Sequence, residues 1–340
     1  MTTCPLQNWI PYRLLRTGND VRCRWLYIAD RRFTAPFFDQ TQQQCLSHAH
    51  NSGRFSVVST LDGLIDLAPS VPAVAPTAFI FHVSRCGSTL LSQLLALREQ
   101  RIVLSEVPLL DELLRLPEQM PSLPEATYGQ AIRAAVHLLG QRRTGAETEL
   151  IIKLDSWHVA FYPLLRQLYP DVPMVLLYRA PEAVLASHRR QRGRHAIPGL
   201  LPPAFFNLTA TDLAGLDFDP YLARVLTYYF DQFLAIADRD DRAFLLAYRH
   251  DGPAMLQSLM QWLNRPLPEA DWQAVRERSG FHAKRPEQAF WEARPADPLP
   301  DYLRPAHDAY ERLEQKRQVQ PVRVVSTSHA DPTPGQPTPT

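Results

Sequence analysis

The residues best suited to chemistry form a short turn, Ser84-Arg85-Cys86-Gly87-Ser88-Thr89. The turn joins an apolar run at 78–83, typical of a buried parallel strand, to leucines at helical spacing over 90–97. The first N–H groups of such a helix lack backbone partners, and the helix dipole adds positive charge there. Gly87 permits close approach of a ligand, and Arg85 supplies a full charge. These features predict a phosphate-binding loop; the alternative is an ordinary strand-to-helix turn with a capping hydroxyl.

Strands and helices alternate along the chain after this loop. Further strands are predicted at 102–105, 149–154, 173–178 and 243–248. This alternation predicts an α/β fold, a parallel sheet flanked by helices on both faces. Ligands bind at the carboxyl ends of the strands in such sheets. Attention therefore falls on Glu106, Lys153 and Arg179, which close three of the strands.

The loop is not a Walker loop, because Gly-x-x-x-x-Gly-Lys-Ser/Thr is absent from it, and this argues against an ordinary ATPase or GTPase. Ser-Arg-Cys-Gly-Ser-Thr-Leu-Leu instead resembles the Pro-Arg-Ser-Gly-Thr-Thr-Leu-Leu loop of sulfotransferases that use 3′-phosphoadenosine 5′-phosphosulfate (PAPS). It departs from that loop at Ser84, Cys86 and Ser88. The resemblance implies a P-loop-like sulfotransferase fold. It also implies a set of donor contacts, namely Arg85, Cys86, Gly87, Ser88 and Thr89.

A second segment, 175–187, is similar to the sulfotransferase motif that holds the 3′-phosphate of the donor through an arginine and a serine. Here these are Arg179 and Ser187. The family often has a further basic residue where this chain has Gln191, so that role falls loosely on Arg190 or Arg192. The segment 279–286 resembles the late loop that closes over the nucleotide, which adds Lys284 and Arg285 to the implied contacts. The resemblance covers roughly residues 76–290.

Sulfuryl transfer requires cations near the transferred group and a base for the proton of the acceptor. Arg85 and Lys153 are the candidate cations. Glu106 is the first candidate base, because its interval from Arg85 matches that of sulfotransferases with a glutamate base; the alternative is an acid placed at a helix start. His158 is the second candidate, and Asp155 is close enough in sequence to orient Lys153 or His158.

Composition limits the remaining possibilities. The chain has 340 residues, 45% of them hydrophobic and 21% charged, with a net charge of +1. The balance is typical of a globular protein with no general affinity for nucleic acid or membranes. No signal peptide or membrane span is evident, so we expect a cytoplasmic protein. The four cysteines have no paired spacing, and we expect neither a disulfide framework nor a metal site.

Three regions are predicted. Residues 1–70 form an N-terminal extension, 76–320 the sulfotransferase domain, and 325–340 a disordered tail rich in proline, serine and threonine. In the extension, Phe33, Phe37 and Phe38 either dock the region onto the main domain or face a substrate.

The sequence therefore predicts a PAPS-dependent sulfotransferase acting on a hydroxyl or amine of a small-molecule or peptide acceptor. One alternative is a P-loop-like nucleotide kinase or hydrolase, and another is a homologue that binds the nucleotide without turnover. Neither the acceptor nor the oligomeric state follows from the sequence.

Overall fold

A five-stranded parallel sheet in the order β5-β6-β4-β7-β8 lies at the centre of the protein, in a computed structural model that describes residues 6–18, 20–53, 56–289 and 299–320. Its strands are β4 (Pro76–His82), β5 (Arg101–Ser105), β6 (Glu149–Lys153), β7 (Met174–Tyr178) and β8 (Ala243–Ala247). Every residue of β5, β6 and β7 is buried, as expected for strands covered on both faces. The predicted α/β class is confirmed.

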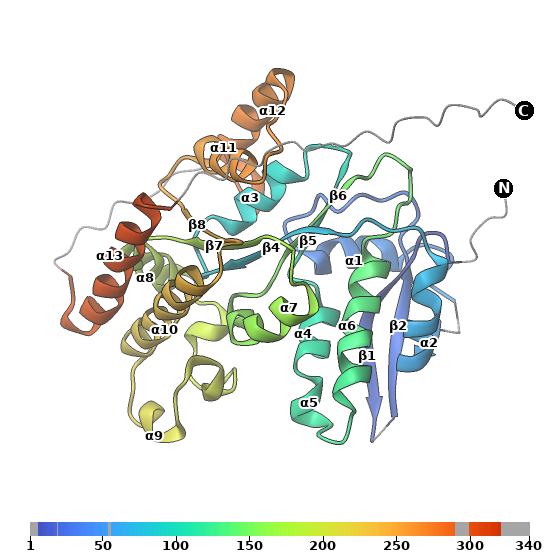
Figure 1. Ribbon diagram of the computed structural model, residues 1–340, viewed down its shortest axis with the longest axis horizontal. Helices are drawn as coiled ribbons and strands as arrows, with labels where there is room; N and C mark the ends of the chain where they lie inside the picture. The colour runs from blue at the N-terminus through green and yellow to red at the C-terminus, as the bar shows by residue number, and fades with distance from the viewer. Residues whose placement is uncertain (1–5, 19, 54–55, 290–298, 321–340) are drawn as a thin grey trace, which may run out of the picture.

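Helices cover both faces of this sheet. In Figure 1, α3, α11 and α12 lie above the sheet, and α4, α6, α7 and α10 lie below it. Their bounds are α3 (Ser88–Leu95), α4 (Pro108–Leu114), α6 (Glu125–Leu139), α7 (Tyr162–Leu168), α10 (Phe218–Arg239), α11 (Gly252–Trp262) and α12 (Glu269–Ser279). The other helices are α1 (Phe38–Leu46), α2 (Leu61–Leu67), α5 (Leu116–Gln119), α8 (Pro181–Arg190), α9 (Ala210–Leu213) and α13 (Arg304–Gln318). Five short 3₁₀ turns are described, η1 (Ala68–Ser70), η2 (Ser156–Phe161), η3 (Arg194–Ala196), η4 (Pro203–Phe206) and η5 (Asp301–Leu303).

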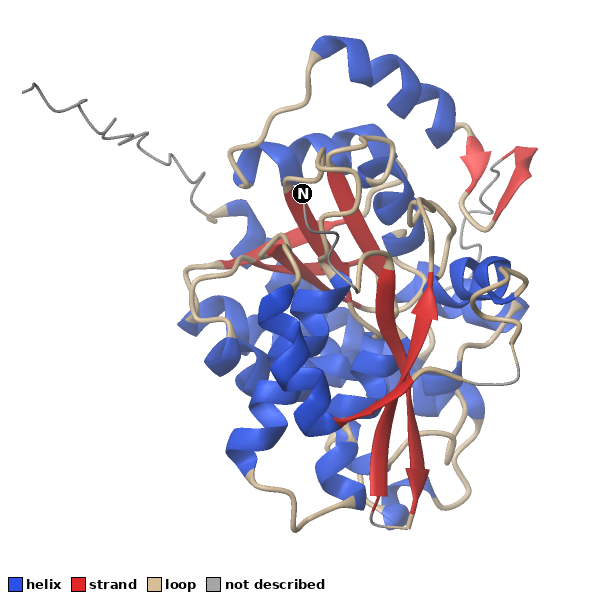
Figure 2. Ribbon diagram, turned by 90° about the vertical axis from the view of Figure 1, so that its right-hand side faces the viewer, coloured by secondary structure: helices blue, strands red, loops and turns tan. Residues whose placement is uncertain are grey.

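The chain before the parallel sheet forms a small antiparallel sheet of β1 (Trp9–Thr17), β2 (Asp20–Tyr27) and β3 (Val58–Thr60). β1 and β2 make a long ribbon, and β1 contacts α4 and α6 (Figure 2). Phe33 and Phe38 stack with ring centroids 5.7 Å apart and are buried in the shared core. The division of the chain near residue 70 stays a prediction.

The last described segments are β9 (Phe281–His282), β10 (Arg285–Ala289) and α13, which packs against α10. The predicted disordered tail, 325–340, lies outside the described residues. None of the helices described here has the length and apolar character needed to cross a membrane.

Candidate active site

The turn between β4 and α3 is a strained strand-to-helix connection. Gly87 has φ +81° and a Cβ there would lie 2.8 Å from Cδ2 of Tyr248, so the position requires glycine. Arg85 has φ +61°, a left-handed conformation that residues with a Cβ rarely adopt. Such strain persists where the surrounding structure enforces it, and it concentrates at functional sites. Ser88 and Thr89 then open α3, and its first N–H groups face the turn.

Cys86 contributes to this loop through its backbone alone. The side chain is fully buried, and burial raises the pKa of the thiol to about 12. The thiol therefore stays protonated and unreactive at neutral pH.

The two predicted motifs meet at this loop. The Arg85 Nε–H donates to the Ser187 hydroxyl at 2.7 Å. Arg179, at the end of β7, donates from Nη1 to the Arg85 carbonyl at 3.0 Å, across 94 residues of sequence. Its guanidinium also lies 5.4 Å from the centre of the Tyr248 ring. Burial lowers the pKa values of Arg85 and Arg179, and the mutual repulsion of the neighbouring guanidinium groups lowers them further.

The arginines at the end of α8 and just after it separate into two groups. Asp219 holds Arg189 at 2.8 Å and Arg192 at 2.7 Å. Arg190 is exposed, and its charge lowers the pKa of Arg85, which places it beside the loop. Of the two residues that the resemblance left open, both line the same cavity as Arg85, but Arg192 is paired with Asp219.

Glu106 stands across from these arginines, directly after β5. It has φ +56°, the same left-handed conformation as Arg85. Its carboxylate lies 2.7 Å from Lys153 Nζ and 3.7 Å from His82 Nε2. Burial alone would raise the pKa of Glu106, but the Lys153 ammonium and the other positive groups around it, Lys284 among them, together outweigh burial and lower the pKa below its ordinary range. Glu106 is therefore ionised at neutral pH.

Lys153 and Lys284 both act on Glu106, and both lie over the Phe37 ring. Lys153 is fully buried and points to Glu106 rather than into open space. Lys284 Nζ lies 5.1 Å from the centre of the Phe37 ring, and Lys153 Nζ lies 5.3 Å from the same centre. Burial lowers the pKa of Lys284 to about 8, with repulsion from Arg85 as the next cause. The backbone of Arg285 begins β10, but its side chain lies outside the described structure.

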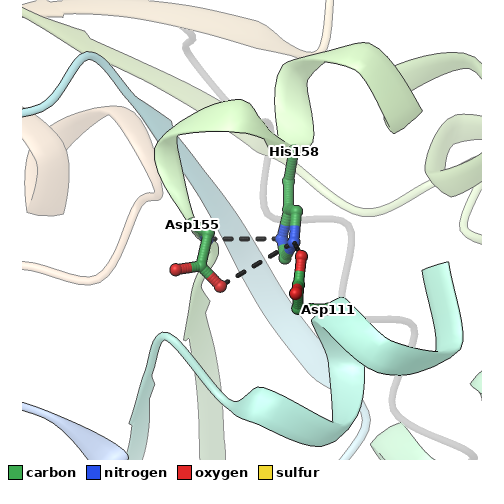
Figure 3. A group of neighbouring side chains, drawn as sticks. All are labelled: Asp111, Asp155 and His158. Carbon is green, nitrogen blue, oxygen red and sulfur yellow. Dashed lines mark hydrogen bonds and ion pairs between the residues drawn. The ribbon is translucent and has the colours of Figure 1, made fainter. Parts of the chain in front are cut away.

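His158 belongs to a hydrogen-bonded cluster with Asp111 and Asp155 (Figure 3). The backbone N–H of Asp155 donates to His158 Nδ1 at 3.2 Å, so the ring hydrogen sits on Nε2, which donates to Asp111 Oδ1 at 3.0 Å. The Trp157 indole N–H donates to the same oxygen at 2.7 Å. With both ring nitrogens engaged, His158 positions Asp111 in this arrangement instead of offering a free base to a substrate.

This cluster also has the composition of a metal site. One ligand atom each from Asp111, Asp155 and His158 lie within 4.8 Å of one another. The hydrogen bonds argue for a different use, because His158 Nε2 carries a hydrogen and Asp111 Oδ1 already accepts from two donors. A metal ligand would need these lone pairs. We therefore treat the cluster as a carboxylate site.

Asp155 has an unusual protonation equilibrium. Burial raises its pKa to about 7, and the neighbouring Glu106 and Asp111 carboxylates add to the shift. At Asp111 burial would also raise the pKa, but the interactions with His158, the hydrogen bond from Trp157 and the charge of Arg115 together outweigh burial and lower the pKa. The two carboxylates therefore differ in charge near neutral pH.

A cavity of about 690 Å³ joins these groups, a size that accommodates a small-molecule ligand. Nine of the predicted site residues line it, namely Arg85, Gly87, Ser88, Thr89, Glu106, Arg179, Ser187, Arg190 and Lys284. Cys86, Lys153 and His158 lie behind its wall. Sequence reasoning missed Asp111, Trp157 and Tyr248 as lining residues, whereas Phe37 is one of the three phenylalanines for which it left a substrate-facing position open.

Comparison with known proteins gives likenesses of fold. No protein-family model matches the chain, and no curated protein matches it. It is similar to the sulfotransferase STF9 from Mycobacterium avium, at 15% identity over 73% of this chain and 76% of that one, with a TM-score of 0.41. It is also similar to the sulfotransferase domain of the olefin synthase from Synechococcus PCC 7002, at 19% identity over 58% of this chain and 76% of that one, with a TM-score of 0.36.

Proposed function

We propose that this protein is a sulfotransferase that moves the sulfuryl group of PAPS to a hydroxyl or amine of an acceptor. The contact between Arg85 and Ser187 carries the proposal, because it joins the loop to the second motif across 102 residues of sequence. A chance resemblance of two separate segments would not require them to meet. They meet at one cavity, with the carboxylate of Glu106 on its other side.

The donor fits the basic side of this cavity, which is the part lined by Arg85, Arg179 and Arg190. The N–H groups at the start of α3 and the Arg85 guanidinium suit the 5′-phosphosulfate, since helix N-termini and guanidinium groups both bind such anions. Arg179, Ser187 and Arg190 suit the 3′-phosphate. The loop lacks the lysine that a Walker loop directs at the phosphates of ATP, which favours PAPS over a nucleoside triphosphate.

The transfer step requires one bond to form and one to break. The acceptor oxygen or nitrogen attacks sulfur in line, the bond from sulfur to the phosphate oxygen breaks, and 3′,5′-ADP leaves. Glu106 takes the proton of the acceptor, because its carboxylate is ionised and lines the cavity. Arg85 and Lys284 stabilise the charge on the sulfuryl and leaving oxygens. Lys153 holds Glu106 in position in the free protein.

Calorimetric titration with 3′,5′-ADP, 5′-ADP and ATP, each without and with Mg²⁺, tests the donor assignment. We expect 3′,5′-ADP to bind at least about tenfold more tightly than 5′-ADP without Mg²⁺, because only 3′,5′-ADP carries a 3′-phosphate that can make charge-assisted hydrogen bonds at that position. Preference for ATP with Mg²⁺ would instead identify a kinase or hydrolase. Binding of 3′,5′-ADP without release of it from PAPS in the presence of acceptors would identify a non-catalytic binding protein. The cytoplasmic location stays a prediction.

A further inference from the structure

The basic and acidic residues that line the cavity follow different strands of the sheet. Arg85 and Arg179 follow β4 and β7, whereas Glu106 and Asp155 follow β5 and β6, on the other side of β4. Asp111, on α4, extends the acidic side. A donor with two phosphate groups accounts for the basic side alone. The acidic side lies where the acceptor must approach Glu106.

Asp111 is held as an ionised carboxylate by neutral donors. Trp157 and His158 both donate to Oδ1, and neither brings a full charge to it. Arg115 lies 3.5 Å from Oδ2 and is the cation of this carboxylate. Asp111 is therefore fixed in direction and stays ionised.

Asp155 is a buried carboxylate for which no ion pair with a lysine or an arginine is found among the described residues. Only 9% of its surface is exposed, and that surface faces the cavity. Among the described residues, the His158 ring is the possible cationic partner within 4 Å, with Nε2 3.7 Å from Asp155 Oδ2. That ring is neutral, since Nδ1 accepts the Asp155 backbone N–H. Lys153, the nearest buried lysine in sequence, is paired with Glu106 instead.

The other charged groups on this wall have partners as well. Arg13 bridges Glu112 and Asp39, at 3.0 and 3.3 Å. Arg194 lies over the Trp157 ring, 5.5 Å from its centre. A buried carboxylate is costly unless it is paired, so the position calls for a cation from the ligand.

The geometry points to an acceptor that carries an ammonium group. We propose that Asp155, with Asp111 beside it, binds this ammonium while the acceptor hydroxyl reaches Glu106, an inference that rests on the proposed function and names its acceptor class. The ammonium serves recognition and is not the nucleophile. The Trp157 ring, on the same wall, offers an apolar face to the carbon frame of the acceptor.

Three benzyl alcohols of matched shape and different charge test this proposal: 4-(aminomethyl)benzyl alcohol, 4-methylbenzyl alcohol and 4-(hydroxymethyl)benzoate. Each is titrated calorimetrically, at about pH 8, into the full chain saturated with 3′,5′-ADP. We expect the amine to bind at least about tenfold more tightly than the neutral compound, and the carboxylate most weakly. Asp155→Asn should reduce the preference for the amine to less than about threefold, and Asp111→Asn should reduce it in the same direction.

Asp238→Asn is the matched control, because Asp238 is an exposed carboxylate paired with Lys316 on the outside of α10. It should keep the full preference. Equal affinity for the amine and the neutral compound, a preference for the carboxylate, or an unchanged preference in Asp155→Asn would overturn the proposal. So would the absence of amine binding in a protein that binds 3′,5′-ADP. Failure to bind 3′,5′-ADP would instead overturn the proposed function.

Discussion

On the β7 side of β4, the cavity wall presents guanidinium groups, and Arg85 and Arg179 donate to a hydroxyl and to a carbonyl. On the β5 and β6 side, the wall presents carboxylates, and Asp111 accepts from an indole and a neutral imidazole. Hydrogen bonds with uncharged groups thus set the direction of a charged group on both sides, and Asp111 also has an ion-pair partner in Arg115, 3.5 Å from its Oδ2. The difference in sign means that one side suits an anionic ligand and the other a cationic one. On the β5 and β6 side, Glu106 and Lys153 form an ion pair at 2.7 Å.

Glu106→Gln should cause the largest loss. If Glu106 takes the proton of the acceptor, the rate of 3′,5′-ADP release from PAPS with a hydroxyl acceptor should fall by about 10²–10⁴-fold. Affinity for 3′,5′-ADP should change less than about threefold, because the nucleotide binds the other side. Kinetics and calorimetry on the same preparation measure the two effects.

The substitution also leaves the buried Lys153 ammonium without its carboxylate, which is destabilising. Glu106→Gln combined with Lys153→Met removes that charge and should show the same loss of turnover. Glu99→Gln, at an exposed position, is the control and should keep full turnover. Turnover that survives in the folded Glu106→Gln protein would exclude Glu106 as the base.

Arg179→Ala tests the basic side. We expect 3′,5′-ADP to bind about 10–100-fold more weakly, since a charge-assisted hydrogen bond to phosphate is lost, whereas 5′-ADP should change less than about threefold. Arg189→Ala removes an arginine that Asp219 holds outside the cavity, and it should change neither affinity. Equal losses for both nucleotides in Arg179→Ala would contradict the assignment of this residue to the 3′-phosphate.

Much of the basic side could be predicted from the sequence, because it depends on local pattern. A buried apolar run predicts each strand, and the residue that ends a parallel strand lies at the ligand-binding edge. Glu106, Lys153 and Arg179 were found in this way, and Arg85 from the pattern of the strand-to-helix turn. The choice between Arg190 and Arg192 could not be made, since it depends on the distant carboxylate of Asp219.

The acidic side depends on contacts that no local pattern encodes. Trp157 and His158 are near neighbours in sequence, but their common partner, Asp111, precedes them by more than forty residues. Phe37 reaches the site from the N-terminal region, and of three neighbouring phenylalanines only tertiary packing selects it. The strand β1 escaped prediction as well: its sequence mixes apolar residues with Arg13 and Arg16, and packing against α4 and α6 fixes it.

Asp155→Asn should stabilise the free protein above neutral pH. The pKa of Asp155 is raised to about 7 in the folded state, so between about pH 4 and 7 the folded state holds a proton that the unfolded state has released. The free energy of unfolding therefore falls as pH rises through this window. Above about pH 7 the folded protein bears the whole loss of stability that comes from ionising the buried Asp155 carboxylate. Asparagine cannot ionise and should recover on the order of 1–3 kcal/mol at pH 8.

Thermal or urea unfolding of both proteins at pH 5 and pH 8 measures this effect. The advantage of the variant should be larger at pH 8 than at pH 5, where Asp155 is protonated in the folded protein. Asparagine also serves as a helix cap, so the start of η2 is preserved. A variant that is less stable than the parent at pH 8 would show that Asp155 is a structural residue with adequate partners.

Ser187→Ala should have the smallest effect and gives the finest distinction. The hydroxyl accepts from Arg85 at 2.7 Å in the free protein, and its loss should weaken 3′,5′-ADP binding by about 3–10-fold, the worth of one hydrogen bond. The response of 5′-ADP then decides how Ser187 acts. If Ser187 binds the 3′-phosphate directly, the affinity for 5′-ADP stays constant. If it chiefly holds Arg85 for the 5′-phosphate, the affinities for both nucleotides fall by the same factor.

A combined Ser187→Ala and Arg179→Ala protein separates these two roles further. If both residues bind the 3′-phosphate, the effects of the two substitutions should be coupled for 3′,5′-ADP and additive for 5′-ADP. No change for either nucleotide would mean that the contact between the two motifs does not contribute to the donor site.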